Sequence, residues 1–483
     1  MASTDDGRSA LAPVPAADVD RWDLDTDVIV VGLGCAGASA AIEAAAGGVD
    51  VTVLEAAAMG GGTSAMSGGI IYLGGGTPVQ QACGYEDSPE NMEAFLTAAC
   101  GPGVDAAKVR AYCEDSVGHF HWLVEHGVPF EHSYFPEHDR EPPDTSGLVF
   151  SGGEDSWPFN ELATPVPRGH HPAHADAAGG FLMQRLIEAV ARSGATTVTD
   201  AAVQRLVVDD GVVVGVEMTV DGEHRHARAR RGVVLTAGGF TFNKTMVEEH
   251  CAPALRCNVP IGTPHDDGRA IRMAMGVGAT TIGMDHLEVG IPLAPPRSVV
   301  RGIIVNAAGE RFMNEDTYAG RLGQEFLLRQ DGRVYWVHDD ETFAVNIAGY
   351  KPRWVAETAA ELETEIGLPA GSLEATLDRY NRHAELGEDP QHHKAAEYVV
   401  PLRPPYGVVD LGVDRSYYAT FTLGGLSTTP AGEVVSASGE PVGGLFAAGR
   451  TTAGIAAAGY VSGISLGDGT YFGRRAGRSA AGN

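Results

Sequence analysis

Basic charge is scarce in this chain of 483 residues, which carries 34 Lys and Arg residues against 63 Asp and Glu residues. The formal net charge of −29 argues against nucleic acid and anionic membrane surfaces as partners, because both attract positively charged proteins. Long apolar runs are also missing. No run of about 18 apolar residues occurs without a glycine or a charge, so we expect no membrane-spanning helix.

Cysteine is sparse as well, and none of the six cysteines forms a CxxC pair or a Cys/His cluster with zinc spacing. We therefore expect no metal site, and reduced thiols in a cytoplasmic protein. Residues 1–25 are acidic and rich in Ala and Pro, without the basic start and apolar core of a signal peptide. This segment is predicted to be a disordered tail, and residues 477–483 are predicted to form a tail at the other end.

Glycine is abundant, and its most informative cluster lies in residues 27–55, which predict a strand, a tight turn, a helix and a second strand. Gly32 permits the turn, Gly34 lets the backbone approach a pyrophosphate, and Gly37 lets the helix pack closely on the strand. The pyrophosphate would lie at the helix N-terminus, where free N–H groups favour negative charge. Glu55 ends the second strand, where a carboxylate can accept hydrogen bonds from a ribose. The pattern predicts a dinucleotide site; the alternative is an ordinary buried βαβ unit.

A second glycine-rich segment, residues 59–77, cannot form the interior of a helix or strand and suits a loop wrapped around a flat ligand. Residues 133–175 are rich in Pro, His and Gly and predict a long irregular loop of the kind that often walls an active site. Periodicity predicts helices over 89–100, 105–126, 180–192, 268–276, 354–366, 372–386 and about 463–476, and strands over 203–208, 212–220, 226–231 and 232–240.

At about residue 277 the sequence changes to a mixture of predicted strands, charged helices and Pro-rich turns. Glycine-rich segments return near residue 403. We therefore predict an α/β fold: a Rossmann-like FAD-binding domain from residues 26–276 and 403–476, with a mixed α+β cap inserted over 277–402. No second glycine fingerprint follows. A separate NAD(P)H site is not expected, so electrons would be exchanged with an external partner.

Several motifs give the chain its resemblance to a known group. It resembles the fumarate reductase/succinate dehydrogenase flavoprotein superfamily from about residue 25 to 476, and within it the 3-ketosteroid Δ4-(5α)-dehydrogenases. The superfamily motifs are the Gly32–Gly37 turn with Glu55, Thr236–Gly239, Gly309–Glu315 and Gly444–Gly449. The motifs of the ketosteroid branch are Tyr72–Pro78, Ala163–His170, Asn314–Arg321 and Gly459–Arg474.

Other branches of this superfamily fit less well. Fumarate-type enzymes carry a His-Gly-x-Asn-Arg segment that grips carboxylates, whereas residues 457–462 here contain neither His nor Arg. An Arg proton donor follows an Asp-Asp pair in those enzymes, but Glu341 follows Asp339 and Asp340 here. The Tyr-Pro-Gly-Pro-Gly segment typical of ketosteroid Δ1-dehydrogenases is absent. Arg450 stands where many members of the superfamily have an acid. The steroid-type branch resembles this chain at that position.

The resemblance implies non-covalent FAD and an apolar cyclic ketone, most simply a steroid, as substrate. It implies Ser462 as the base at C4, Tyr318 as a proton relay and Tyr460 as the donor to the C3 carbonyl. Each could instead be structural: Tyr318 packed in the cap, Tyr460 packed on the flavin, Ser462 a turn hydroxyl. The expected FAD-binding residues are Gly32, Gly34, Cys35, Ala36, Gly37, Glu55, Gly61, Gly62, Thr63, Ser64, Ser67, Gly68, Gly69, Ala237, Gly238, Gly449, Arg450, Ser465 and Leu466.

Desaturation beside a ketone needs a base for the α-proton, a donor for the enolate oxygen and a hydride acceptor, and a tyrosine hydroxyl suits the second role. Three functions stay open: a ketosteroid desaturase, an enzyme of a smaller cyclic ketone or an enone reductase, and a flavin-binding protein without turnover.

The histidines are expected outside the site. His170, His171 and His174 are predicted on a solvated loop, and His119, His121 and His126 on a helix surface.

Overall fold

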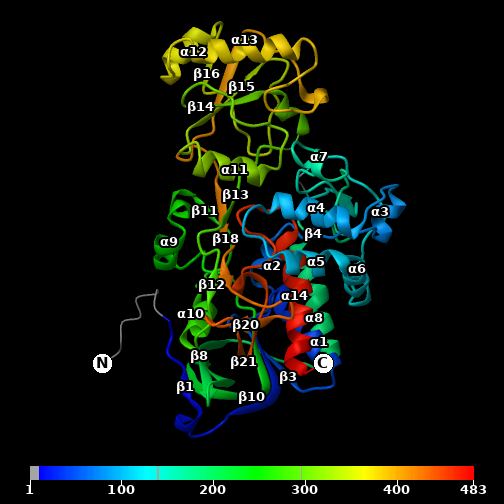
Figure 1. The fold of residues 1–483 in the computed structure, drawn as a ribbon, viewed down its shortest axis with the longest axis vertical. Coiled ribbons are helices and arrows are strands. Elements are labelled where there is room, and N and C mark those ends of the chain that lie inside the picture. The colour runs from blue at the N-terminus through cyan, green and yellow to red at the C-terminus, as the bar shows by residue number, and fades with distance from the viewer. Residues whose placement is uncertain (1–9, 139–140, 295, 483) are drawn as a thin grey trace.

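The computed structural model describes residues 10–138, 141–294 and 296–482. Its elements form an elongated molecule, with a large sheet at one end and a smaller helix-covered sheet at the other (Figure 1). The large sheet has the strand order β1-β8-β9-β10-β2-β3-β7, and β21 pairs with both β10 and β20. Its strands are β1 Val14–Pro15, β2 Leu24–Val31, β3 Val51–Leu54, β7 Thr196–Val198, β8 Ala201–Asp209, β9 Val212–Val220, β10 Glu223–Leu235, β20 Glu433–Val435 and β21 Pro441–Ala447.

Strand β10 joins two parts of this sheet. Its first half is antiparallel to β9, and its second half is parallel to β2 and β21. The buried run of β2 divides its side chains between two cores, as expected where both faces of a parallel sheet are covered. Val28 and Val30 pack with the helices, whereas Ile29 and Val31 pack with the β8–β10 meander.

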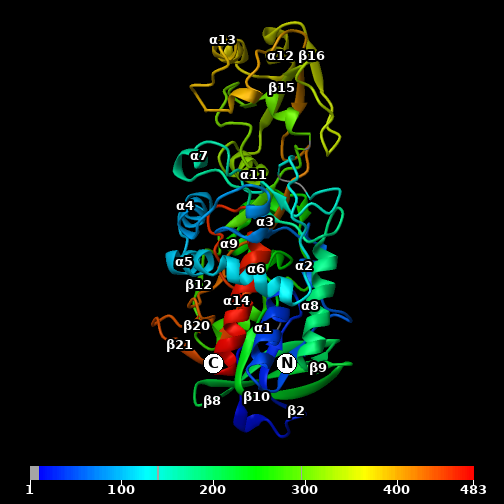
Figure 2. The same cartoon turned by 90° about the vertical axis from the view of Figure 1, so that its right-hand side faces the viewer.

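Three helices lie side by side along the parallel strands, as both views show (Figures 1 and 2): α1 Cys35–Ala46, α14 Ile464–Ala481 and α8 Gly179–Ser193. Glycines on α14 permit this close packing. A Cβ atom on Gly473 would lie 2.3 Å from the Ala36 carbonyl oxygen, and one on Gly477 would lie 2.2 Å from that of Ala40. The C-terminal stretch therefore completes the layer that covers the first strands.

The middle of the molecule holds a group of short helices: α3 Pro78–Ala82, α4 Pro89–Ala99, α5 Ala106–Glu114, α6 Ser116–Glu125 and α7 Phe159–Leu162. Beside them lies a small sheet of β4 Ile71–Tyr72, β6 Gly169–His170 and β5 Leu148–Val149. The predicted single helix over 105–126 is two helices that meet at Asp115. Residues 133–175, predicted as one irregular loop, contain β5, α7 and β6.

The far end contains a sheet of order β14-β15-β17-β16 with its own core under α12 Ala359–Ile366 and α13 Ser372–Ala384. The strands are β14 Ile303–Asn306, β15 Val334–Asp339, β16 Trp354–Ala356 and β17 Tyr406–Asp410. The predicted helix 354–366 is β16 followed by α12. Because β17 pairs with β15 and β16, this sheet takes in residues beyond 402, where the sequence analysis placed the end of the insert.

Between the two ends lies a sheet of order β11-β18-β13, formed by β11 Val259–Pro260, β18 Ala419–Thr422 and β13 Leu287–Gly290. Helix α11, Ala319–Leu328, packs against β13. The remaining elements are α2 Gly62–Met66, α9 Lys244–His250, α10 Arg269–Gly276, β12 Thr281–Ile282, β19 Gly425–Leu426 and short 3₁₀ turns at Ala16–Asp18, Ala252–Arg256, Arg297–Arg301, Ala396–Tyr398 and Gly449–Thr451.

Two predictions about the chain ends are wrong where they can be checked. Residues 10–25 are ordered: β1 pairs in parallel with Val207 and Val208 of β8. Residues 477–481 continue α14, because Gly477 packs on α1. The rest of the predicted N-terminal tail, residues 1–9, and Asn483 lie outside the described residues. No helix in the described part of the chain combines the length and apolarity needed to cross a membrane.

Candidate active site

The turn after β2 has the geometry that its glycines predict. Gly32 has a φ of +95°, and a Cβ atom there would lie 2.8 Å from the Thr236 carbonyl oxygen. A Cβ atom on Gly37 would lie 1.9 Å from the Gly32 carbonyl oxygen, so only glycine lets α1 start this close to the turn. Glu55 supports the same turn, since its carboxylate accepts hydrogen bonds from the backbone N–H groups of Leu33 at 2.7 Å and Ala57 at 2.9 Å.

A cavity of about 480 Å³ opens in front of this turn. Its wall contains most of the residues expected to bind FAD: Gly32, Gly34, Cys35, Ala36, Glu55, Gly62, Thr63, Ser64, Ser67, Gly68, Gly69, Ala237, Gly238, Gly449, Arg450, Ser465 and Leu466. Gly37 and Gly61 are not among the residues that line the cavity. The cavity therefore joins the glycine turn, the 59–77 segment, the turn after β10 and the start of α14, although these are far apart in the sequence.

The electrostatics of the cavity fit a negatively charged pyrophosphate. Helices α1 and α14 both begin at its wall, with Cys35 and Ala36 of α1 and Ser465 and Leu466 of α14 in the lining. The N-terminus of a helix carries partial positive charge and free N–H groups, so both helices favour a negative group here. The residues present thus fit FAD: a close-approach glycine turn, two helix N-termini and a carboxylate at the ribose position.

Asp266 is a wall residue that the sequence analysis missed. It is 3% exposed and accepts hydrogen bonds from the backbone N–H of Gly239 at 3.0 Å and from the Thr63 hydroxyl at 2.5 Å. Arg450 donates to both of its oxygens at 3.2 Å. Asp266 thus connects three segments of the wall and partners the charge of Arg450. The two acids before α10 were the available signal, but their long-range partners cannot be seen in the sequence.

The three predicted catalytic hydroxyls all line this cavity. Tyr460 donates a hydrogen bond to the Ser465 hydroxyl at 3.1 Å and packs edge-on against Phe421, with ring centroids 5.4 Å apart. Ser462 is fixed through its backbone: its N–H donates to the Ser151 carbonyl oxygen at 3.1 Å, and its carbonyl oxygen accepts the Ser151 hydroxyl at 3.0 Å. Burial raises the pKa of Tyr460 to about 12, so this phenol keeps its proton at neutral pH.

Tyr318 is the N-cap residue of α11, and its hydroxyl donates a hydrogen bond to Oε1 of Glu288 at 3.1 Å. Glu288 also lines the cavity, and the sequence analysis missed it. A single acid within the apolar strand β13 was the only available signal. The structure therefore adds a buried carboxyl to the predicted set of hydroxyls.

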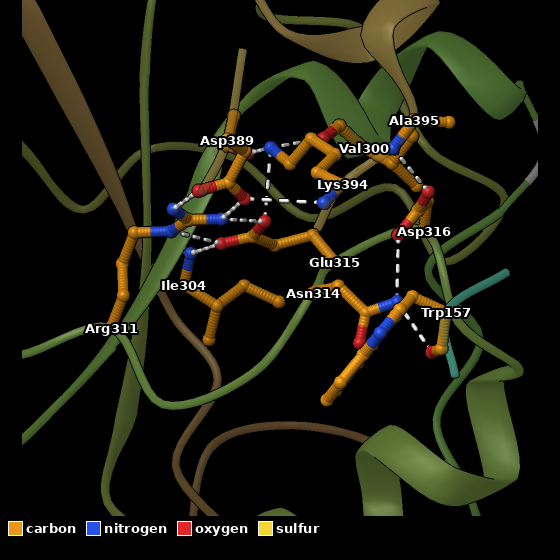
Figure 3. A network of polar contacts seen from close by, with 11 residues as sticks. Trp157, Val300, Ile304, Arg311, Asn314, Glu315, Asp316, Asp389, Lys394 and Ala395 are labelled. Carbon is orange, nitrogen blue, oxygen red and sulfur yellow. Dashed lines mark hydrogen bonds and ion pairs between the residues drawn. The ribbon is translucent and has the colours of Figure 1, made fainter. Parts of the chain in front are cut away.

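A buried ion network fixes the segment that leads into Tyr318 (Figure 3). Arg311 binds Glu315 through two bonds of 3.0 and 2.8 Å and Asp389 through two bonds of 2.9 Å. Lys394 lies 3.0 Å from Glu315. Asp316 accepts from the backbone of Ala395 at 2.8 Å. Burial alone would raise the pKa of Glu315, but the charges of Arg311 and Lys394 hold it below its ordinary value. The network thus joins residues 311–316, which lead into Tyr318, to residues 389–395.

The histidines lie outside the cavity wall except for His265. The prediction of a solvated loop is wrong for His170 and His171, which are buried; His174 is exposed. His119, predicted on a helix surface, is buried against α14, where its ring contacts the Thr470 hydroxyl at 2.8 Å. The sequence could not show this contact, because it joins segments 351 residues apart. In the described residues, no group of three or more His, Cys, Asp or Glu side chains could hold a metal ion.

Comparison with known families decides the cofactor. Residues 27–466 match the model of a family described as an FAD binding domain. The chain belongs to this family. The predicted cofactor, FAD, and the predicted α/β fold of the fumarate reductase/succinate dehydrogenase flavoproteins are thereby confirmed.

Proteins that are similar to this chain over nearly its full length include ketone dehydrogenases. The structure of a 3-ketosteroid-Δ4-(5α)-dehydrogenase from Rhodococcus jostii RHA1, in complex with 4-androstene-3,17-dione, is 47% identical, covers 98% of this chain and 100% of that chain, and has a TM-score of 0.94. A 3-oxo-5-alpha-steroid 4-dehydrogenase from Comamonas testosteroni is 27% identical, over 90% of this chain and 94% of that protein. A 4-oxocyclohexanecarboxylate 2-dehydrogenase from Sinomonas cyclohexanicum is 28% identical, over 94% and 93%.

These similarities confirm the expected kinship with the 3-ketosteroid Δ4-(5α)-dehydrogenases. The chain is an FAD-dependent oxidoreductase of the type that acts on CH–CH groups.

Proposed function

We propose that this chain desaturates a 3-keto-5α-steroid between C4 and C5, with FAD in the cavity in front of the Gly32 turn. The observation that carries the proposal is that Tyr318, Tyr460 and Ser462 line the same cavity as that turn. A ketone between these hydroxyls and the FAD site would meet a donor and a base. The Rhodococcus neighbour, similar over the whole chain, binds 4-androstene-3,17-dione, which has the C4–C5 double bond that this reaction would form.

In this proposal each hydroxyl has one task. Tyr460 donates to the C3 carbonyl oxygen and stabilises the negative charge that develops there; its raised pKa of about 12 suits a neutral donor. Ser462 takes the proton from C4, and Tyr318 passes it on. When bound, FAD accepts the hydride that leaves C5. The Tyr460 hydroxyl now donates to Ser465, so substrate binding would redirect that hydrogen bond.

FAD binding follows from the turn and its supports. The Gly32 turn and the α1 N-terminus would hold the pyrophosphate, and Glu55 would accept from the ribose with the lone pairs that Leu33 and Ala57 leave free. We propose that no covalent bond holds the flavin. Denaturation of the purified yellow protein should then release all colour into the supernatant, and colour left on the precipitate would contradict this.

A second candidate substrate is a smaller cyclic ketone, which the similarity to the Sinomonas 4-oxocyclohexanecarboxylate 2-dehydrogenase favours. A carboxylate substrate would need a cation beside the hydroxyls. Among the described residues of the cavity wall, the only arginines are Arg269 and Arg450, and each pairs with an aspartate. This pairing supports an uncharged steroid over a carboxylate.

The test is product analysis with an artificial electron acceptor, since the proposal places the natural acceptor outside the chain. 5α-Androstane-3,17-dione should lose two hydrogens and gain the ultraviolet absorbance of a conjugated enone. 4-Oxocyclohexanecarboxylate, assayed in parallel, should react poorly. Desaturation of the cyclohexanone with no reaction of the steroid would favour the second candidate and reject the first.

A further inference from the structure

Glu288 is a buried carboxyl that contacts one of the predicted catalytic hydroxyls, that of Tyr318. It lies on β13, is 3% exposed and lines the cavity, and its Oε1 accepts the Tyr318 hydroxyl at 3.1 Å. Gly320 leaves the space that this pair occupies. A Cβ atom there would lie 1.9 Å from Oε1 of Glu288 and 2.4 Å from Cε1 of Tyr318. The pair therefore fits only beside a glycine at position 320.

The backbone around Glu288 is held on both sides. Its own carbonyl oxygen accepts the Thr420 hydroxyl at 2.7 Å, and the carbonyl oxygen of Leu287 accepts Nε2 of Gln324 at 2.7 Å. A Cβ atom on Gly323 would lie 2.0 Å from the Val289 carbonyl oxygen, which shows how closely α11 packs on β13. The carboxyl and the Tyr318 hydroxyl thus sit on two elements in direct contact.

No cation in the described part of the chain pairs with this carboxyl. In the described residues, no ion pair includes Glu288, and its Oε2 has no hydrogen-bond partner. The titratable groups that face it are Tyr318 from the start of α11, Tyr460 from the segment before α14 and Cys100 from the end of α4; β18 contributes Thr420 and Phe421, which do not titrate. Burial raises the pKa of Glu288 to about 8, against the hydrogen bond from Tyr318. The carboxyl therefore titrates within the working range of an enzyme.

Three of the four other acids of the cavity wall are engaged elsewhere, and the fourth, Glu141, lies beside Gly68. Glu55 accepts from the glycine turn, Asp266 pairs with Arg450, and Asp267 pairs with Arg269. A serine hydroxyl is a very weak base by itself, so a proton taken by Ser462 needs a stronger acceptor behind it. Glu288 has the position and the chemistry of that acceptor.

We infer that Glu288 is the positioning residue that receives the proton passed on by Tyr318, an inference that rests on the proposed desaturation. As the C4–H bond breaks, its electron pair forms the C3–C4 double bond of the enolate and its proton goes to the Ser462 oxygen. The Ser462 hydroxyl proton moves to the Tyr318 oxygen, and the Tyr318 proton moves to Oε1 of Glu288. The carboxylate becomes a carboxylic acid, which later releases its proton to water. The enolate would then collapse: the C3–O double bond forms again and the C3–C4 electron pair becomes the C4–C5 double bond, while bound FAD would accept the hydride that leaves C5.

The experiment compares wild type with Glu288→Gln in the FAD-loaded protein. Glutamine still accepts the Tyr318 hydrogen bond but cannot take its proton. The rate of anaerobic flavin bleaching by 5α-androstane-3,17-dione is measured from about pH 6 to about pH 10, which brackets the expected midpoint. The wild-type rate should rise with a midpoint near pH 8 as the carboxylate forms. Glu288→Gln should lose this rise and be slower by about 10²–10⁴-fold, the usual effect of losing an acid–base group.

Three variants complete the test. Asp285→Asn removes an exposed carboxylate just before β13 and should keep the wild-type rate and pH profile. Tyr318→Phe combined with Glu288→Gln should be no slower than the slower single variant, because both act in one relay. Glu288→Asp keeps a carboxylate and should retain the pH-dependent rise at a reduced rate. If Glu288→Gln fails to bind FAD, the pH profile of Glu288→Asp decides whether the carboxyl has this role.

The outcomes separate the inference from the proposed function. A steroid that bleaches wild type and Glu288→Gln with the same pH profile would overturn the role of Glu288 alone. A wild-type flavin that no 3-keto-5α-steroid bleaches would overturn the proposed function, and the inference with it.

Discussion

Glu288 also makes a prediction about stability that does not depend on turnover. Its folded pKa of about 8 lies above its ordinary value of 4.5, and this difference corresponds to about 5 kcal/mol. Because the folded-state pKa is raised, the stabilising contribution is complete below pH 4.5 and is lost as the pH rises to about 8. At pH 7 about 3 kcal/mol of the free energy of unfolding should already be lost.

Glu288→Gln removes this dependence because the amide stays neutral. The thermal unfolding midpoint of the variant, measured with FAD in fixed excess, should therefore exceed that of wild type by an amount that grows from pH 5 to about pH 8 and then levels off. Asp285→Asn, whose carboxylate is exposed, serves as the control and should show no such growth. A difference between Glu288→Gln and wild type that stays constant over this range would refute the raised pKa.

Three further predictions concern the other parts of the site. Tyr460→Phe keeps the ring and loses the donor to the enolate oxygen, so kcat should fall by about 10²–10³-fold at normal FAD content; a rate within about twofold of wild type would reject that role. Glu55→Ala should weaken FAD binding, measured by flavin fluorescence titration, by about 1–3 kcal/mol through loss of charge-assisted hydrogen bonds. Arg311→Met leaves Glu315 and Asp389 without their shared partner and should lower the free energy of unfolding by about 3–5 kcal/mol in a denaturant titration; an unchanged midpoint would contradict the structural role of the network.

The local parts of the fold could be predicted from the sequence. The Gly32 turn and its flanking strands are set by neighbours in the chain, so the residues alone indicate them. The ends of elements were less certain: periodicity does not show that α14 continues to Ala481, because its last turns pack through Gly477 against Ala40 of α1, which is distant in the sequence. Residues 10–25 look like a tail in composition, yet Val14 pairs with Val207 of β8.

The acids of the site could not be predicted, for a physical reason. Glu288 and Tyr318 are 30 residues apart, and Asp266 and Arg450 are 184 apart. Each pair exists only because separate elements pack together: α11 on β13 in the first case, and two turns of the cavity wall in the second. The prediction that His119 lies on a helix surface failed for the same reason, because its neighbours Thr470 and Arg474 belong to α14.

The most direct test of the proposed function is anaerobic bleaching of the bound flavin by the two C5 epimers of androstane-3,17-dione. Hydride transfer needs the reacting atoms about 3–3.5 Å apart, and the hydrogen at C5 can face the flavin in only one epimer. The 5α epimer should bleach the flavin rapidly, and the 5β epimer and succinate should do so poorly. Equal bleaching by both epimers, or bleaching by succinate alone, would contradict the account.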